Sequence, residues 1–347
     1  MAKMRCVVVR EHGQDTSALL FEEREIPEPG PGDVRIKVAA CAMNHLDTWV
    51  RRGVPGHKFP LPIIPGCDIA GTVHALGPGV KDTKTGDRVA VSPGTSCGSC
   101  RACLSGRDHL CRDYGILGEH RDGGYAEYAV VPARNLIPIP DSMTFPEAAA
   151  VSLVFLTAWH MLVERCQIRP GEDVLVHAAG SGIGSAAIQI AKLWGARKII
   201  ASASSQAKLD RARELGATHL VNHAQQDLAQ EVRKITGKMG VDIVLEHTGA
   251  ATWDASLRSV KWAGRIVTCG ATSGPEVKLD LRPVFFKSLS ILGSTMGSQG
   301  ELREIWEHVR AGALKPVVDV VWPLEKVREA HERMAKREQI GKIVLAP

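Results

Sequence analysis

The pattern of hydrophobic and polar positions changes near residue 145 of the chain. Before that point, short apolar runs are separated by turns rich in proline and glycine, such as Pro27–Gly32. Short apolar runs bounded by turn residues predict β-strands, here at Val7–Val9, Val34–Val38 and Arg88–Val91. The first 140 residues are therefore predicted to be rich in β-structure.

From residue 145 onward, strands and helices are predicted to alternate. A helical segment rich in Ala and Leu comes first, and short apolar runs then alternate with longer helical stretches. Such alternation is typical of a parallel sheet covered by helices on both faces, so an α/β domain is expected. The runs are Val174–Val176, Lys198–Ile200, Ile243–Leu245, Arg265–Val267 and Ser290–Leu292, followed by a helix at Leu302–Arg310 and a strand at Lys342–Leu345.

Length, composition and charge narrow the function classes. A chain of 347 residues with 44% hydrophobic and 23% charged residues is expected to form about two globular domains. The 43 Lys and Arg residues exceed the 38 Asp and Glu residues by only five, and no run of five like charges occurs. Neither a nucleic-acid-binding arm nor a polybasic membrane anchor is therefore expected.

No targeting segment or membrane span is expected either. The most apolar stretch, Ala148–Leu162, is short and contains Ser152, Thr157 and His160. The expected location is therefore cytoplasmic.

Four of the nine cysteines lie within fifteen residues, at Cys97, Cys100, Cys103 and Cys111. Without a secretion signal, such a cluster indicates a metal site before it indicates disulfides. Four thiolates can close a tetrahedral shell around zinc, and a closed shell is structural rather than catalytic. The sequence therefore predicts one structural Zn²⁺ per chain, in a lobe of residues 92–113.

A nucleotide-binding turn is predicted directly after the strand Val174–Val176. Small residues there let backbone amides approach a pyrophosphate, and the following helix supplies unpaired N–H groups. The strict G-x-G-x-x-G spacing is not met, because the corresponding positions are Ala179, Ser181 and Gly184. The position between a strand and a helix nevertheless supports the motif, so we expect the amides of Gly180, Ser181, Gly182, Ile183 and Gly184 to bind the cofactor.

The end of the next strand bears on the choice between NAD(H) and NADP(H). An NAD-binding site usually places an acidic residue there, but residues 200–208 contain no carboxylate. Ser202, Ser204, Ser205 and Lys208 could instead accept a 2′-phosphate. NADP(H) is therefore favoured over NAD(H), although the same residues could form an ordinary solvated loop.

With these motifs in place, the chain resembles the medium-chain dehydrogenase/reductase superfamily, which includes zinc alcohol dehydrogenases and quinone oxidoreductases. The resemblance covers nearly the whole length. Besides the cysteine lobe and the turn, it rests on Pro65–Val73, Gly86–Val89 and Gly124–Tyr128.

The resemblance implies a fold and an assembly. A GroES-like β-rich domain is expected at residues 1–152 and 297–347, with a Rossmann domain inserted at 153–296 and the active site between the two. The resemblance also implies a homodimer, or a tetramer, formed edge to edge by the Rossmann domains.

The same resemblance implies a departure from zinc alcohol dehydrogenases. Their catalytic zinc has three protein ligands, at whose positions this chain has Asn44, Cys67 and Leu153, and Leu46 stands where they relay the alcohol proton. Leucine can do neither task, so the chain resembles the zinc-independent reductases of quinones, enones and enoyl thioesters. A rearranged catalytic metal site remains an alternative, with ligands drawn from Cys41, His45, Asp47, Cys67, Asp68 and His120.

Hydride transfer to an electron-poor alkene needs donors for the carbonyl oxygen and a proton for the α-carbon. Asn44 is the first candidate donor and His120 a second, while Asp47 is expected to hold backbone amides. Cys67 is a candidate ligand or a core residue. The residues expected to contact the cofactor, by resemblance, also include His45, Thr157, Thr248, Cys269, Gly270, Ala271, Ser294, Thr295 and Met296.

Three functions are compatible with these features. The leading one is an NADPH-dependent reductase of activated C=C bonds or quinones that acts on a small molecule. The second is an alcohol dehydrogenase with an unusual catalytic metal. The third is a nucleotide-binding structural protein that has lost activity, and the complete turn argues against it.

Overall fold

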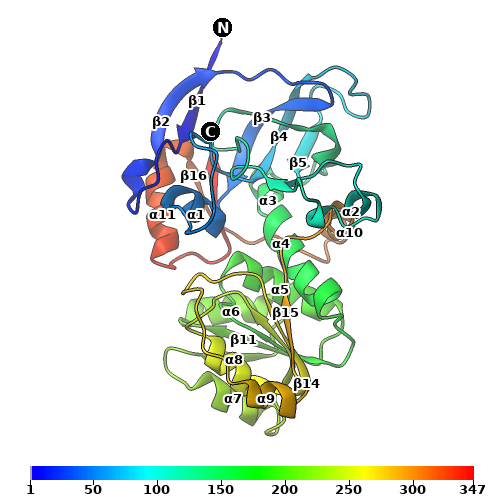
Figure 1. Ribbon diagram of the computed structural model, residues 1–347, viewed down its shortest axis with the longest axis vertical. Helices are drawn as coiled ribbons and strands as arrows, with labels where there is room; N and C mark the ends of the chain where they lie inside the picture. The colour runs from blue at the N-terminus through cyan, green and yellow to red at the C-terminus, as the bar shows by residue number, and fades with distance from the viewer. Residues whose placement is uncertain (1) are drawn as a thin grey trace. The chain divides into compact units, whose positions relative to one another are not determined.

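The computed structural model describes residues 2–347, which form two compact units. The first unit comprises the residues up to Leu153 together with Ser298–Glu304 and Pro316–Pro347. The second comprises Val154–Gly297 and Ile305–Lys315 (Figure 1).

The first unit is organised around a seven-stranded, mostly antiparallel sheet in the order β16–β17–β3–β4–β5–β9, with β8 also beside β3. In β3, Val34, Ile36 and Val38 alternate with more exposed residues, which is the period-two pattern of a strand with one buried face. The strands are β3 (Asp33–Ala42), β4 (Asp68–Leu76), β5 (Arg88–Val91), β8 (Tyr128–Pro132), β9 (Leu136–Pro138), β16 (Val318–Pro323) and β17 (Lys342–Ala346).

Strand β17 pairs with β3, with Val344 opposite Ala42. The start of the last strand is thereby placed next to the residues that follow β3. The remaining elements are the hairpin β1 (Lys3–Val8) and β2 (Leu20–Glu25), the short strands β6 (Gly94–Thr95) and β7 (Gly115–Ile116), and the helices α1 (His45–Arg52), α2 (Arg101–Leu104), α3 (Phe145–Ala149) and α11 (Val327–Ala335).

The second unit contains a six-stranded parallel sheet in the order β12–β11–β10–β13–β14–β15. Numbered within the unit, this is 3-2-1-4-5-6, the order of a doubly wound nucleotide-binding fold. The strands are β10 (Asp173–Val176), β11 (Lys198–Ala203), β12 (His219–Asn222), β13 (Val241–Glu246), β14 (Val260–Thr268) and β15 (Ser290–Gly293).

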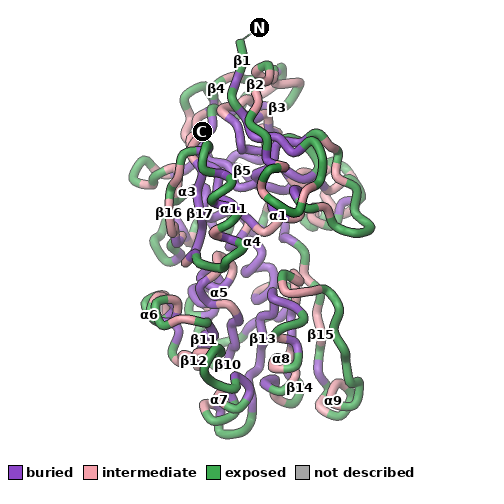
Figure 2. Tube along the Cα trace, turned by 90° about the vertical axis from the view of Figure 1, so that its left-hand side faces the viewer, coloured by how far each residue is buried: buried purple, intermediate pink, exposed green. Residues whose placement is uncertain are grey.

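Strands β10 and β13 are buried along their whole length, as expected for strands with helices on both faces (Figure 2). The predicted α/β fold, a GroES-like domain with a Rossmann domain, is confirmed. The helices are α4 (Ser152–Trp159), α5 (Gly182–Leu193), α6 (Gln206–Leu215), α7 (Leu228–Ile235), α8 (Trp253–Ser259), α9 (Leu281–Phe286) and α10 (Gln299–Arg310).

Residues 305–315 group with the second unit, whereas the sequence placed them in the first domain. The physical reason is packing: the His308 ring lies 5.4 Å from the Trp159 ring, and Gln189 bonds to both backbone polar groups of Lys315.

One helical stretch, Phe145–Arg165, is long and apolar enough to cross a membrane. However, 78% of its most apolar window is buried inside the fold, and buried core helices of soluble proteins meet the same criterion. The stretch is therefore only weak support for a membrane span.

Candidate active site

The predicted nucleotide-binding turn connects β10 to α5 in the second unit. Ser181 caps α5, where its hydroxyl accepts a hydrogen bond from the Gly184 amide (3.0 Å). A Cβ at Gly184 would lie 2.5 Å from the Ala178 carbonyl oxygen, so only glycine allows this close approach of helix and strand. The first amides of α5 are thus available to a pyrophosphate, and the turn fits a dinucleotide cofactor.

Lys208 lies directly over this turn, because a Cβ at Gly180 would be 2.6 Å from its Cγ. Ser204 is exposed and Ser205 caps α6, so both hydroxyls are open to a ligand. Ser202 differs, since it is fully buried and its hydroxyl lies 2.8 Å from Nδ1 of His223. Its side chain is therefore committed to the protein rather than to a 2′-phosphate.

A buried carboxylate fixes a second turn of the sheet, at the end of β13. Glu246 is fully buried and accepts hydrogen bonds from the amides of Thr248 (2.7 Å) and Gly249 (3.0 Å) and from the hydroxyls of Thr252 and Ser256. The backbone of Thr248, a predicted cofactor residue, is thus fixed by its hydrogen bond to Glu246.

The other predicted cofactor residues of the second unit differ in accessibility. Thr157 is buried in α4 and Met296 is buried after β15, while Thr295 is exposed. The hydroxyl of Ser294 is buried without a partner among residues 2–347. Cys269, Gly270 and Ala271 are half-buried and follow β14.

The first unit contains a buried polar cluster formed by Asn44, Cys67, Asp68 and Lys342. The ammonium of Lys342 lies 3.0 Å from Oδ2 of Asp68 and 2.5 Å from Oδ1 of Asn44. The Asn44 amide nitrogen donates to the same Asp68 oxygen (2.9 Å) and lies 3.4 Å from Cys67 Sγ. The backbone amide of Leu153 donates to the other Asp68 oxygen (2.9 Å).

This cluster contains the three positions that the resemblance aligned with the ligands of a catalytic zinc. Asn44 contacts both Cys67 and Asp68, and the backbone amide of Leu153 contacts Asp68, so the three positions lie in one cluster. What the sequence did not reveal is that a lysine from the last strand joins them. Burial raises the pKa of the Cys67 thiol well above its usual value.

Asp47 has the structural role that the sequence predicted, because its carboxylate accepts from the amides of Asn44 (2.7 Å) and Gly66 (3.1 Å). The Tyr125 hydroxyl also donates to it (3.0 Å). Burial raises the pKa of Asp47 to about 6 against the opposing effect of these bonds. Gly66 has a φ of 94°, and a Cβ there would lie 2.5 Å from the Tyr125 ring, which explains the glycine.

His45, the first residue of α1, is predicted to contact the cofactor phosphates. Burial, together with the positive charges of Arg337, Lys342 and Arg52, lowers the pKa of His45 to about 4. The imidazole is therefore neutral at pH 7 and can act as a hydrogen-bond partner but not as a counter-charge.

His120 lies in a second cluster, with His57 and Glu119, and not with Cys67. The His57 Nε2 is 3.2 Å from the buried Glu119 carboxylate. His120 Nδ1 accepts a hydrogen bond from the Ile116 amide (3.1 Å), so a neutral ring carries its proton on Nε2. That arrangement makes His120 a hydrogen-bond donor and leaves it without a free lone pair for a metal.

The four cysteines of the lobe lie together, with their sulfur atoms all within 4.8 Å of one another, so they could hold the predicted metal ion. Their sulfur atoms are separated by 3.5 Å (Cys97–Cys111), 3.6 Å (Cys100–Cys103) and 3.9 Å (Cys97–Cys103). A zinc–sulfur distance of about 2.3 Å gives a tetrahedron with edges of about 3.8 Å, so the thiols fit zinc without rearrangement. Backbone amides of Ser99 and Cys100 lower the pKa of Cys97 to about 6, which favours the thiolate.

Sequence reasoning missed Lys342, His57 and Glu119. The only signal for Lys342 was a charged residue at the start of an otherwise apolar strand. His57 and Glu119 had no signal, because they are 62 positions apart and belong to no spaced motif.

Comparisons with known proteins agree with this geometry. Residues 30–141 match the family model for the alcohol dehydrogenase GroES-like domain, and residues 182–311 match the zinc-binding dehydrogenase model. The human quinone oxidoreductase is 31% identical, with 99% of this chain and 97% of that protein covered. A 2-haloacrylate reductase from Burkholderia sp is 32% identical, with 99% of both covered.

Among solved structures, one described as an NAD-dependent alcohol dehydrogenase is 50% identical, with a TM-score of 0.95. The match covers 99% of this chain and 100% of that one. Relatives with reductase and with alcohol dehydrogenase names therefore share this fold over their full lengths.

The metal centre leads to a prediction about stability. Replacing Cys103 with Ser opens the thiolate shell, so the variant is expected to lose its zinc and to unfold at lower urea concentration than the parent. Elemental analysis and urea unfolding measure the two effects, with Cys166→Ser, a buried cysteine outside the lobe, as the control. A Cys103→Ser protein that keeps one zinc per chain would contradict the assignment.

The polar cluster leads to a second prediction. Asp68→Asn leaves the buried Lys342 ammonium without a carboxylate, which is expected to cost about 3–5 kcal/mol of unfolding free energy. Adding Lys342→Met removes the uncompensated charge, so the double variant is expected to recover most of the unfolding free energy that Asp68→Asn loses. Urea unfolding of the two single variants and the double variant tests the coupling, and strictly additive losses would show that the two side chains do not form a pair.

Proposed function

Since this chain belongs to the medium-chain dehydrogenase/reductase superfamily and is an NAD(P)-dependent oxidoreductase, we propose that it reduces activated C=C bonds or quinones without a catalytic metal. The relatives named quinone oxidoreductase and 2-haloacrylate reductase act on substrates of these classes. The observation that carries the proposal is the Lys342 ammonium among Asn44, Cys67 and Asp68.

The proposal that the reaction needs no catalytic metal is supported by the hydrogen bonds that this cluster already makes. Both oxygens of Asp68 and the amide oxygen of Asn44 accept hydrogen bonds from the protein, and Leu153 contributes only its backbone. A catalytic zinc needs about three protein ligands and an open position. Cys67 is the one soft ligand left, so a metal here would have to break a buried ion pair.

A nicotinamide cofactor held by the turn would supply a hydride for the electron-poor β-carbon, and the substrate oxygen would then carry negative charge. The protein has to stabilise that oxygen with N–H donors already in place and to provide a proton for the α-carbon. Asn44, the donor expected from the sequence, makes its hydrogen bonds to Asp68, Cys67 and Lys342, so we assign it a positioning role.

The His57–Glu119–His120 cluster offers further groups of the first unit for these tasks. His120 presents an Nε2–H donor on a partly exposed ring, and a protonated His57 held by Glu119 is a proton source. We therefore propose that His120 donates a hydrogen bond to the substrate oxygen and that His57 provides the proton for the α-carbon.

An alcohol dehydrogenase activity is the second candidate, because the 50% identical structure carries that description.

The superfamily's dimer also belongs to the proposal. Strand β15 is an unpaired sheet edge, and α9, which precedes it, exposes Phe285 and Phe286 by 62% and 65%. We propose a cytoplasmic homodimer that pairs through this edge.

The reaction itself is tested with a panel of substrates. Enones and quinones are expected to be reduced at neutral pH, and primary alcohols to be oxidised at least about tenfold more slowly, because Leu46 and Leu153 provide neither relay nor ligand. A mild chelator, which leaves a closed thiolate shell intact, should not change enone reduction. Rapid oxidation of benzyl alcohol that the chelator abolishes would instead establish the second candidate.

The cofactor preference needs its own test, since the 50% identical relative is described as NAD-dependent. NADPH is expected to give the higher kcat/KM, because residues 200–208 carry no carboxylate and Lys208 lies over the turn. Lys208→Ala should narrow the preference by about tenfold, or about 1.4 kcal/mol, while Lys234→Ala on α7 should leave it unchanged. Equal or higher kcat/KM with NADH in the parent enzyme would refute the preference.

A further inference from the structure

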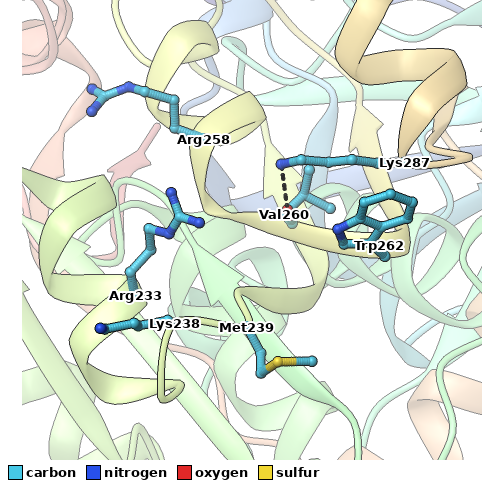
Figure 3. Close-up of a pocket in the computed structure, with 7 residues that line it drawn as sticks. All are labelled: Arg233, Lys238, Met239, Arg258, Val260, Trp262 and Lys287. Atoms are coloured by element: carbon cyan, nitrogen blue, oxygen red, sulfur yellow. Dashed lines mark hydrogen bonds between the residues drawn. The ribbon is translucent and has the colours of Figure 1, made fainter.

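A basic pocket lies at the edge of the second unit's sheet where β13 and β14 begin. Its lining comes from α7, α8, the start of β14 and the residue that ends α9, and its volume is about 190 Å³. The lining residues are Arg233, Lys238, Met239, Arg258, Val260, Trp262 and Lys287 (Figure 3).

This pocket is separate from the cofactor turn. In a parallel sheet all strands run in the same direction, and the turn follows Val176, at the carboxyl end of β10. Met239 precedes Val241 at the amino end of β13. The two sites therefore lie at opposite edges of one sheet, and the nicotinamide cofactor does not account for the pocket.

The cations of the pocket are poorly neutralised. Arg258 forms ion pairs with Asp254 (2.7 Å) and Asp227 (3.4 Å), and its guanidinium points away from the others in Figure 3. No carboxylate within residues 2–347 pairs with Arg233, Lys238 or Lys287. The ammonium of Lys287 donates to the Val260 carbonyl oxygen, at 3.5 Å.

Arg233 and Lys287 point toward the same space above Val260 (Figure 3). Burial and the positive charge of Arg233 lower the pKa of Lys287, so the two cations lie close enough to repel each other. An anion between them would remove that repulsion and form charge-assisted hydrogen bonds to both. The pocket is therefore arranged for a ligand with negative charge.

Apolar surface beside these cations narrows the ligand further. Trp262 is 66% exposed and Met239 is 68% exposed, which is unusual for such large apolar side chains. A volume of about 190 Å³ is room for phosphate groups beside the indole. A flat group attached to the phosphates would extend out of the pocket and stack on the indole ring of Trp262.

We propose that the basic pocket binds a diphosphate group between Arg233 and Lys287. The diphosphate is either inorganic pyrophosphate or the diphosphate of a nucleotide whose base stacks on Trp262. The site is distinct from the cofactor turn, so the inference does not depend on which substrate the enzyme reduces.

Isothermal titration calorimetry tests this with pyrophosphate and with ADP, on enzyme saturated with its nicotinamide cofactor so that the turn is blocked. We expect one pyrophosphate per chain at physiological salt. Arg233→Ala and Lys287→Ala should each weaken binding by at least about tenfold. Lys234→Ala is the matched control, because Lys234 neighbours Arg233 on α7 but pairs with Glu231, and it should change binding by less than about twofold.

The variant Trp262→Ala distinguishes the two candidate ligands, inorganic pyrophosphate and a nucleotide diphosphate. If ADP binds about tenfold more tightly than pyrophosphate and loses this advantage in Trp262→Ala, the ligand is a nucleotide. If both bind equally and Trp262→Ala has no effect, it is inorganic pyrophosphate. No binding at physiological salt would overturn the proposal, as would an equal loss in Lys234→Ala, which would indicate diffuse surface charge. Arg233 is exposed, so its variant keeps the test decisive even if Lys287→Ala fails to fold.

Discussion

The buried ion pair between Asp68 and Lys342 is the interaction on which our account of the first unit depends. Both side chains are buried, with Asp68 at 0% and Lys342 at 3% exposure, and they are 274 positions apart in the sequence. Because β17 pairs with β3, the lysine enters the space beside Asn44 and Cys67. A buried carboxylate is costly unless it is paired and hydrogen-bonded, and Asp68 is both.

That arrangement separates the two possible roles of zinc in this protein. The lobe holds four thiols at distances that suit a closed tetrahedron, so a metal there stabilises the fold. The polar cluster supplies one thiol and places the Lys342 ammonium beside Asn44 and Asp68. These two features are the basis of our proposal that zinc is structural in this chain and that reduction proceeds without a catalytic metal.

Features that depend on local patterns could be predicted from the sequence. The parallel sheet followed from apolar runs such as Val174–Val176, and the metal lobe from the spacing of Cys97 and its neighbours. The site could be predicted only in part, because its decisive contacts join distant segments. Lys342 reaches Asp68 through strand pairing, and Ser202 proved to be committed to His223, which only the folded structure reveals.

X-ray absorption at the zinc edge of the purified holoenzyme tests the central claim most directly, because it reports the atoms around every bound zinc. We predict a single environment of four sulfur atoms at about 2.3 Å, from Cys97, Cys100, Cys103 and Cys111, with no nitrogen or oxygen contribution. A second environment with mixed sulfur, nitrogen or oxygen ligands would contradict the account, because it would mean that metal displaces Lys342 from the polar cluster.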